Sequence, residues 1–152
     1  MTDLLRLLRT AIAHWHPAFV HFPVALILAG AGLEAFRIAR RRPGRSPAAR
    51  MLLALGASAA LLAVVSGLLL FHPQEFQGRT LQVARIHRLL GLSTATVALS
   101  ALIAGGIHRE PGPSGRRLML YRALYFAAAA LVGLTGHYGG WIVFGWGAVW
   151  PS

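Results

Sequence analysis

Long apolar stretches alternate with short arginine-rich segments along most of the chain. Four of these stretches have the roughly 20 mostly apolar residues that a helix needs to cross a bilayer. We expect transmembrane helices at about 17–38, 50–71, 86–107 and 118–138. The pattern therefore predicts a single membrane domain, an all-α integral membrane protein built as a four-transmembrane-helix bundle.

The two ends of the chain have patterns of their own. In residues 1–15 large apolar side chains share one helical face, which predicts an amphipathic helix in the membrane interface: Leu5, Leu8, Ile12 and Trp15. This segment lacks the apolar core and the cleavage motif of a signal peptide. Residues 139–152 combine tryptophans with glycines, so we expect an aromatic tail at headgroup level and no continuous helix beyond Gly139 and Gly140.

Composition supports a membrane protein and indicates its orientation. Apolar residues make up 56% of the chain, only 12% are charged, and all positive charge behind the net value of +11 comes from arginine. Ten arginines lie in or beside the loops at 37–50 and 109–122, and five lie at the opposite end. By the positive-inside rule the ten face the cytoplasm, which predicts an N-out/C-out protein of the bacterial inner membrane with both termini periplasmic. Orientation accounts for the arginines, so nucleic-acid binding is not expected.

The absence of cysteine excludes several kinds of site. Disulfide scaffolds, zinc–thiolate sites, iron–sulfur clusters and covalently attached c-type haem all need cysteine, and the chain has none. The four acidic residues are scattered and form no set typical of a hydrolase: Asp3, Glu34, Glu75 and Glu110. Electron transfer or an accessory role is therefore favoured over a stand-alone enzyme.

Two further features concern helix packing. We expect Glu34, at the inner end of the first span, to pair with Arg37 or Arg41. Small residues within the spans indicate close helix contacts: Gly30, Gly32, Gly56, Ser58, Ser66, Gly67, Ser93, Ser100, Gly105 and Gly106.

Histidine is the residue type that points to a function. Six of the seven histidines fall at the predicted outer end of the bundle. Four of them lie where predicted helices begin or end, so we expect their imidazoles to converge at one depth: His16, His21, His87 and His137. For His14, His72 and His108 we expect no more than a hydrogen bond to a carbonyl or a lipid phosphate. Ionisable side chains at the edge of a membrane bundle are candidates for a functional site.

The neighbours of these histidines favour a haem. Gly91 and Gly133 each lie one helical turn deeper than a histidine on the same face, which would leave a flat surface for a macrocycle. Arg85 and Arg88 lie at the same outer end and would pair with haem propionates. These positions together predict a cofactor-binding site.

The simplest cofactor for this site is haem b, with His21 facing His87 or His137 and His16 in support. The protein would then be a small membrane cytochrome b that transfers electrons. Two alternatives remain. The same four histidines would suit copper, zinc or iron, or line a quinone site. Otherwise the histidines are incidental, and the protein is a structural subunit of a larger membrane complex.

Three motifs resemble those of a known family. Residues 16–23 read HPAFVHFP, residues 135–140 read TGHYGG, and His87 with Gly91 lies between them. These motifs are similar to those of a bacterial membrane-protein family catalogued as domain of unknown function 2231. The resemblance implies a four-helix membrane domain whose histidines belong together. Members are often joined to, or encoded with, c-type cytochromes, which implies that a separate periplasmic c-type cytochrome or a larger membrane redox complex is the partner.

Overall fold

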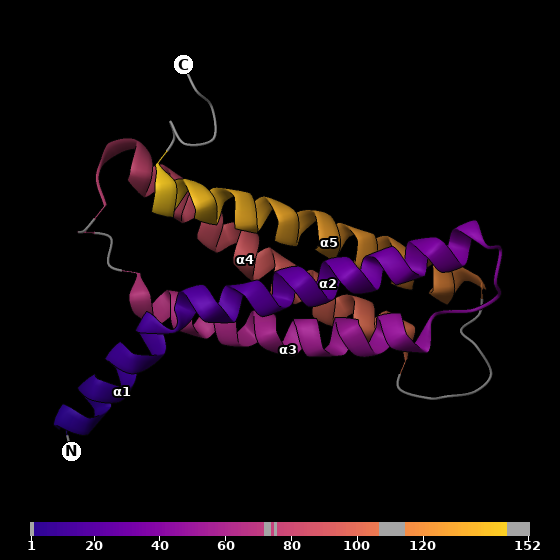
Figure 1. The fold of residues 1–152 in the computed structure, drawn as a ribbon, viewed down its shortest axis with the longest axis horizontal. Coiled ribbons are helices and arrows are strands. Elements are labelled where there is room, and N and C mark those ends of the chain that lie inside the picture. Colours follow the sequence, from indigo (N-terminus) through magenta and orange to yellow (C-terminus); the bar gives the residue numbers. More distant parts are fainter. Residues whose placement is uncertain (1, 72–73, 75, 107–114, 146–152) are drawn as a thin grey trace.

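The computed structural model describes residues 2–71, 74, 76–106 and 115–145 (Figure 1). Its helices are α1 (Thr2–His14), α2 (His16–Ala39), α3 (Pro47–Leu70), α4 (Gly78–Gly105) and α5 (Gly115–Phe144). The last four are long and apolar enough to cross a membrane. The predicted all-α architecture with four membrane-spanning helices is therefore confirmed for the part of the chain that is described.

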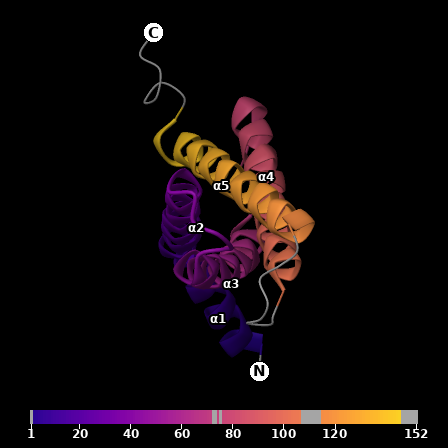
Figure 2. The same cartoon turned by 90° about the vertical axis from the view of Figure 1, so that its right-hand side faces the viewer.

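The four long helices run alternately in opposite directions and form one bundle (Figure 1). α2 packs mainly on α3 and α4 mainly on α5, and the contacts α3–α4 and α2–α5 close the ring. Viewed along the bundle, α2 and α4 therefore occupy opposite corners (Figure 2). In the described part of the chain α2 and α4 do not pack closely on each other, so a side chain of α2 meets one of α4 only across the interior of the bundle.

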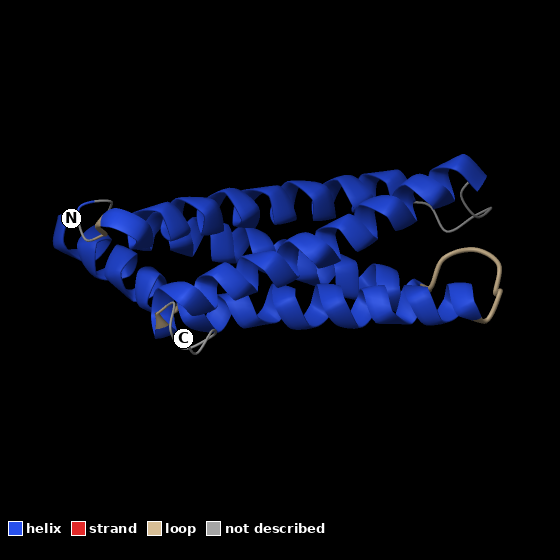
Figure 3. Ribbon diagram, turned by 90° about the horizontal axis from the view of Figure 1, so that it is seen from above, coloured by secondary structure: helices blue, strands red, loops and turns tan. Residues whose placement is uncertain are grey.

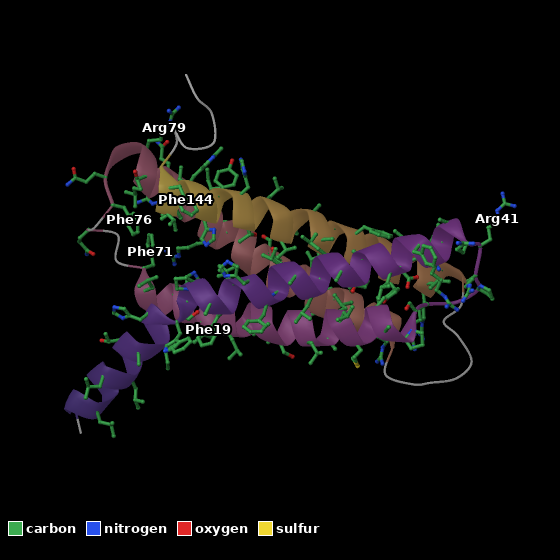
Figure 4. The ribbon with its side chains drawn as sticks, in the orientation of Figure 1. Phe19, Arg41, Phe71, Phe76, Arg79 and Phe144 are labelled. Atoms are coloured by element: carbon green, nitrogen blue, oxygen red, sulfur yellow. The ribbon has the colours of Figure 1, made fainter. Side chains whose placement is uncertain are left out.

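The two ends of the bundle differ in the residues they carry. We call the end where α2 and α4 begin the histidine end, because it contains His16 and His87. We call the opposite end, where the 40–46 loop joins α2 to α3, the arginine end (Figure 3). Arg41 extends from the arginine end, whereas Phe71 and Phe144 lie at the histidine end (Figure 4).

Helix α1 leaves the bundle at the histidine end and contacts α3 and, less closely, α2 (Figure 1). Large apolar side chains along it are exposed, among them Leu8, Ile12 and Trp15 of the predicted apolar face. The side chain of Leu5 lies outside the described residues. An apolar helix surface left outside a membrane bundle fits the predicted position in the interface.

The interior of the bundle is built mainly from small side chains. Ala57, Ala98, Ala101 and Ala128 are completely buried, while large residues such as Leu62 (59% exposed), Ile103 (78%) and Met119 (74%) cover the outside. This distribution is typical of membrane helices, whose backbones approach closely at small residues while the large side chains face lipid. The small residues that were expected at close helix contacts divide into two groups. Some are buried, as expected: Gly30, Gly56, Ser66 and Gly105. Others are exposed: Gly32, Ser58 and Ser93.

Two helices are longer than predicted. α4 begins at Gly78, well before the predicted start at 86, because hydropathy marks only the apolar part and the helix continues into a polar segment. α5 continues through Gly139 and Gly140 to Phe144, so the expected break at these glycines is wrong. A glycine costs a helix only about 1 kcal/mol, and in a membrane an unpaired backbone costs more. The rest of the aromatic tail, from residue 146, lies outside the described residues.

Candidate functional site

Two of the four candidate histidines face each other across the histidine end. His16 is the first residue of α2, and His87 lies in the third turn of α4. Their ring centroids are 6.4 Å apart and the ring planes are nearly perpendicular, at 86°. Both side chains are half-buried. Since α2 and α4 occupy opposite corners, this pair spans the interior of the bundle.

A hydrogen bond to α5 fixes the His87 ring. Nδ1 of His87 lies 2.9 Å from the backbone carbonyl oxygen of Thr135. A carbonyl oxygen can only accept, so Nδ1 must be the protonated nitrogen and Nε2 of the neutral ring keeps its lone pair. The ring reaches the α5 backbone because residue 139 is glycine: a Cβ there would lie 3.1 Å from Cε1 of His87.

The His16 ring is fixed in the same way by α3. Its Nδ1 lies 2.9 Å from the hydroxyl oxygen of Ser66, which itself donates to the carbonyl oxygen of Ala63 at 3.0 Å. With the Ser66 hydroxyl proton directed at Ala63, Nδ1 of His16 donates to the hydroxyl oxygen and Nε2 keeps the lone pair. Gly67 makes room for this ring, since a Cβ there would lie 2.8 Å from Cε1 of His16.

The two rings therefore share one chemical state. Each neutral imidazole donates from Nδ1 to a fixed oxygen, which leaves Nε2 as an unprotonated nitrogen. Histidines that bind metals usually have this arrangement, because a partner at the far nitrogen sets both the tautomer and the ring orientation. The oxygens that orient His16 and His87 belong to Ser66 and Thr135.

The other two candidates do not join this pair. His21 is exposed, and its Nδ1 donates to the carbonyl oxygen of Pro17 in its own helix. His137 is also exposed, and its ring packs on Trp141 with centroids 4.4 Å apart. Among the described residues no three His, Asp or Glu side chains lie close enough together to hold a metal ion. The structure thus brings together two of the four imidazoles that the sequence predicted to converge.

Of the remaining histidines, the structure describes only His14. His14 is exposed, and its Nδ1 lies 2.8 Å from the carbonyl oxygen of Thr10, the local hydrogen bond that was expected. His72 and His108 lie outside the described residues.

The glycines that contact the two rings differ from those named for the macrocycle surface. At Gly91 an added Cβ would meet only Cγ2 of Thr135, at an ordinary 3.8 Å, and at Gly133 it would meet nothing within 4 Å. Gly67 and Gly139 instead receive the two rings. Gly139 belongs to the TGHYGG motif, so the sequence marked it as unusual. Gly67 was expected only as one of several small residues at helix contacts.

Arg85 and Arg88 line a depression on the surface of α4. Arg85 is exposed, while the guanidinium carbon of Arg88 lies 4.1 Å from the centroid of the Phe71 ring. Leu89 and Leu92 complete the lining. None of the hydrogen bonds or ion pairs among the described residues joins these arginines to His16 or His87.

A separate polar network closes the arginine end. The completely buried Glu34 accepts from Nε of Arg122 at 2.9 Å and from the backbone N–H of Ser46 at 2.9 Å. Arg122 also donates to the carbonyl oxygen of Gly44 at 2.8 Å. The expected pairing of Glu34 with Arg37 or Arg41 is therefore wrong: Arg37 donates to the carbonyl oxygens of the 43–44 turn, and Arg41 is exposed. Arg122 lies 88 residues away on α5, so no local sequence pattern indicated that it was the partner.

Comparison with known proteins agrees with this architecture. A family model described as "Predicted membrane protein (DUF2231)" matches residues 14–149. No curated protein and no solved structure matches the chain. The matched range includes both facing histidines and all four long helices. The chain therefore belongs to this family of predicted membrane proteins.

Proposed function

We propose that the protein is a membrane cytochrome b in which His16 and His87 hold haem b at the histidine end. The observation that carries the proposal is the facing pair of imidazoles, each with Nδ1 bound to a fixed oxygen. The axial pair proposed here replaces the expected pairing through His21, which is exposed and bonded to its own helix.

The spacing of the two rings supports a shared iron. An imidazole nitrogen binds a metal at about 2.0–2.1 Å, so two rings on one metal have centroids on the order of 6 Å apart. The observed separation of 6.4 Å is of this size, although the rings meet edge-on in a T-shaped contact that two rings also adopt without a metal. Cofactor sites of helix bundles are commonly built from side chains on facing helices, and His16 and His87 lie on such helices.

The number of ligands favours haem over a bare metal ion. Zinc sites in proteins take three or four protein ligands, and the described residues contain no group of three. Haem iron takes its equatorial ligands from the porphyrin and needs only axial ligands from the protein. Two histidines are thus enough to hold haem b, whereas copper, zinc or iron alone would need further protein ligands.

The residues around His16 and His87 would fix the orientation and the protonation of the two rings. Ser66 and Thr135 hold both rings with Nε2 unprotonated and limit their rotation. Gly67 and Gly139 let the rings lie against the backbones of α3 and α5. When bound, haem b supplies a centre that accepts and releases one electron.

The position of the site suggests how electrons would reach it. The pair lies at one end of the bundle, and the positive-inside rule would place that end at the periplasmic face of the inner membrane. A periplasmic c-type cytochrome or a larger membrane redox complex is then the proposed partner.

Replacing each histidine separately tests the proposal. The variants His16→Ala and His87→Ala, purified in detergent from cells supplied with haem, should lose the absorbance band of reduced haem b. His21→Ala and His137→Ala are matched controls, because they remove the same side chain from exposed positions at the same end. Added imidazole should restore the band in His87→Gly, which would show that the loss comes from a missing ligand and not from misfolding.

The opposite pattern would contradict the proposed pair. If His21→Ala or His137→Ala removed the band while His16→Ala kept it, haem would be held elsewhere. If no variant bound haem and all four assembled like the wild type, a structural subunit would be the better account.

A further inference from the structure

Helix α4 carries a second feature on a different face from His87. Arg85, Arg88, Leu89 and Leu92 line a depression of about 260 Å³ that opens to the outside of the bundle. At 100° per residue these four positions lie about 100–200° around the helix from His87. The depression therefore faces away from the histidine pair, towards the surroundings of the bundle.

The two arginines lie at the level of lipid headgroups. From Leu89 to Gly105 helix α4 contains no charged residue, and at 1.5 Å per residue this segment spans about 25 Å. The hydrocarbon core of a bilayer is about 30 Å thick. Arg88 and Arg85 stand directly before this segment, so their guanidinium groups reach the boundary where the phosphates of phospholipids lie.

The chemistry of the depression fits one phospholipid molecule. Arg85 and Arg88 both line the depression, and the guanidinium carbon of Arg88 lies 4.1 Å from the centroid of the Phe71 ring. Below the arginines, Leu89 is 65% exposed and Leu92 is 42% exposed. The site thus offers two cations at the membrane boundary and an apolar floor one turn deeper.

We propose that this depression binds an anionic phospholipid, with its phosphate between Arg85 and Arg88 and an acyl chain along Leu89 and Leu92. Arginine suits this role because its planar group donates several hydrogen bonds to phosphate oxygens. Basic pockets on membrane helices are known to select lipid headgroups. The inference does not depend on the histidine pair or on a haem.

Lipid binding to the delipidated full chain tests the assignment. Phosphatidylglycerol would be added in detergent and counted by native mass spectrometry for wild type, for Arg85→Gln/Arg88→Gln and for Arg116→Gln/Arg117→Gln. We expect at least about tenfold weaker binding in the first double variant and unchanged binding in the second. The second is the matched control, because it removes two exposed arginines from the opposite end of the bundle.

Two other ligands test separately whether the phosphate or the acyl chains of the lipid are bound. Inorganic phosphate should not displace phosphatidylglycerol, because it makes no contact with the leucines. Diacylglycerol, which has acyl chains and no phosphate, should bind at least about tenfold more weakly.

A third variant distinguishes loss of the binding site from misfolding of the arginine variant. Leu92→Trp keeps both charges and fills the depression, so it should also weaken phosphatidylglycerol binding. Equal binding by wild type and Arg85→Gln/Arg88→Gln would overturn the proposal, as would displacement by inorganic phosphate or equal binding of diacylglycerol.

Discussion

At the scale of single residues, a glycine on a neighbouring helix makes room for each ring of the histidine pair, His16 and His87. The ring of His16 occupies the space that a side chain at Gly67 would fill, and His87 does the same at Gly139. Each ring then reaches an oxygen of that same helix. The glycine and the oxygen acceptor are thus a pair that together fix the imidazole.

Gly67→Ala is expected to damage the histidine site while leaving the helices intact. The new Cβ would lie 2.8 Å from Cε1 of His16, so the ring must move away from Ser66. Haem content per purified chain should fall several-fold, with unchanged helicity by circular dichroism. Gly32→Ala is the control, because an added Cβ there meets nothing within 4 Å and the residue lies towards the other end of α2. Equal haem content in both variants would argue against the assigned positions of the rings.

Gly30→Ala is expected to destabilise the bundle itself. A Cβ at Gly30 would overlap the hydroxyl oxygen of Tyr125, which donates to the carbonyl oxygen of Ala49 at 2.8 Å. Overpacking of this kind lowers the free energy of unfolding by about 1–3 kcal/mol. Unfolding in detergent, compared with Gly32→Ala on the exposed side of the same helix, measures the effect. Gly32→Ala should change the stability by less than about 0.5 kcal/mol.

These residue contacts mark the limit of what the sequence could predict. Four apolar spans and a histidine cluster at one end follow from hydropathy and position alone. The helices are apolar nearly all round, so no polar face indicated that His16 points inward and His21 outward. Ser66 looked like an ordinary small residue of a membrane helix, and Thr135 stood in the TGHYGG motif without a predicted role, because what each contacts depends on another helix.

At the scale of helices, one buried carboxylate joins three of them at the arginine end. Glu34 on α2 accepts from the backbone N–H of Ser46, the residue before α3, and from Arg122 on α5. Ser46 also caps α3, since its hydroxyl oxygen accepts from the backbone N–H of Ala49 at 3.2 Å. The network therefore fixes where α3 begins relative to its neighbours.

Glu34→Gln is expected to destabilise this end of the bundle. The substitution leaves Arg122 without its carboxylate, and breaking a buried pair on one side costs up to about 3–5 kcal/mol. Because the Arg122 side chain is 23% exposed, we expect a value nearer about 2–3 kcal/mol. Arg41→Gln, at an exposed position, is the control.

A double-mutant cycle separates the pair from each residue alone. In Glu34→Gln/Arg122→Gln the loss of unfolding free energy should be smaller than the sum of the single losses, by about 0.5–3 kcal/mol. Additive losses would mean that Glu34 and Arg122 act independently.

At the scale of the whole molecule, the asymmetry of arginine indicates orientation. Ten arginines belong to the arginine end by sequence and five to the other. The prediction is that the arginine end faces the cytoplasm. Because the chain has no cysteine, single introduced cysteines report orientation without background.

Labelling of Gln77→Cys and Arg41→Cys tests this orientation, since both positions are exposed and lie at opposite ends. With a membrane-impermeant maleimide on spheroplasts, Gln77→Cys should react at once and Arg41→Cys only after the membrane is permeabilised. The reverse pattern would place the histidine pair at the cytoplasmic face. A periplasmic c-type cytochrome could then not be its partner.

A haem held by His16 and His87 would colour the protein. The decisive measurement is the optical spectrum of the wild-type protein, oxidised and then reduced with dithionite, combined with a pyridine haemochrome assay. We expect a sharp band of reduced haem b and about one haem per chain. A colourless protein, purified with intact helicity from cells supplied with haem, would contradict this expectation.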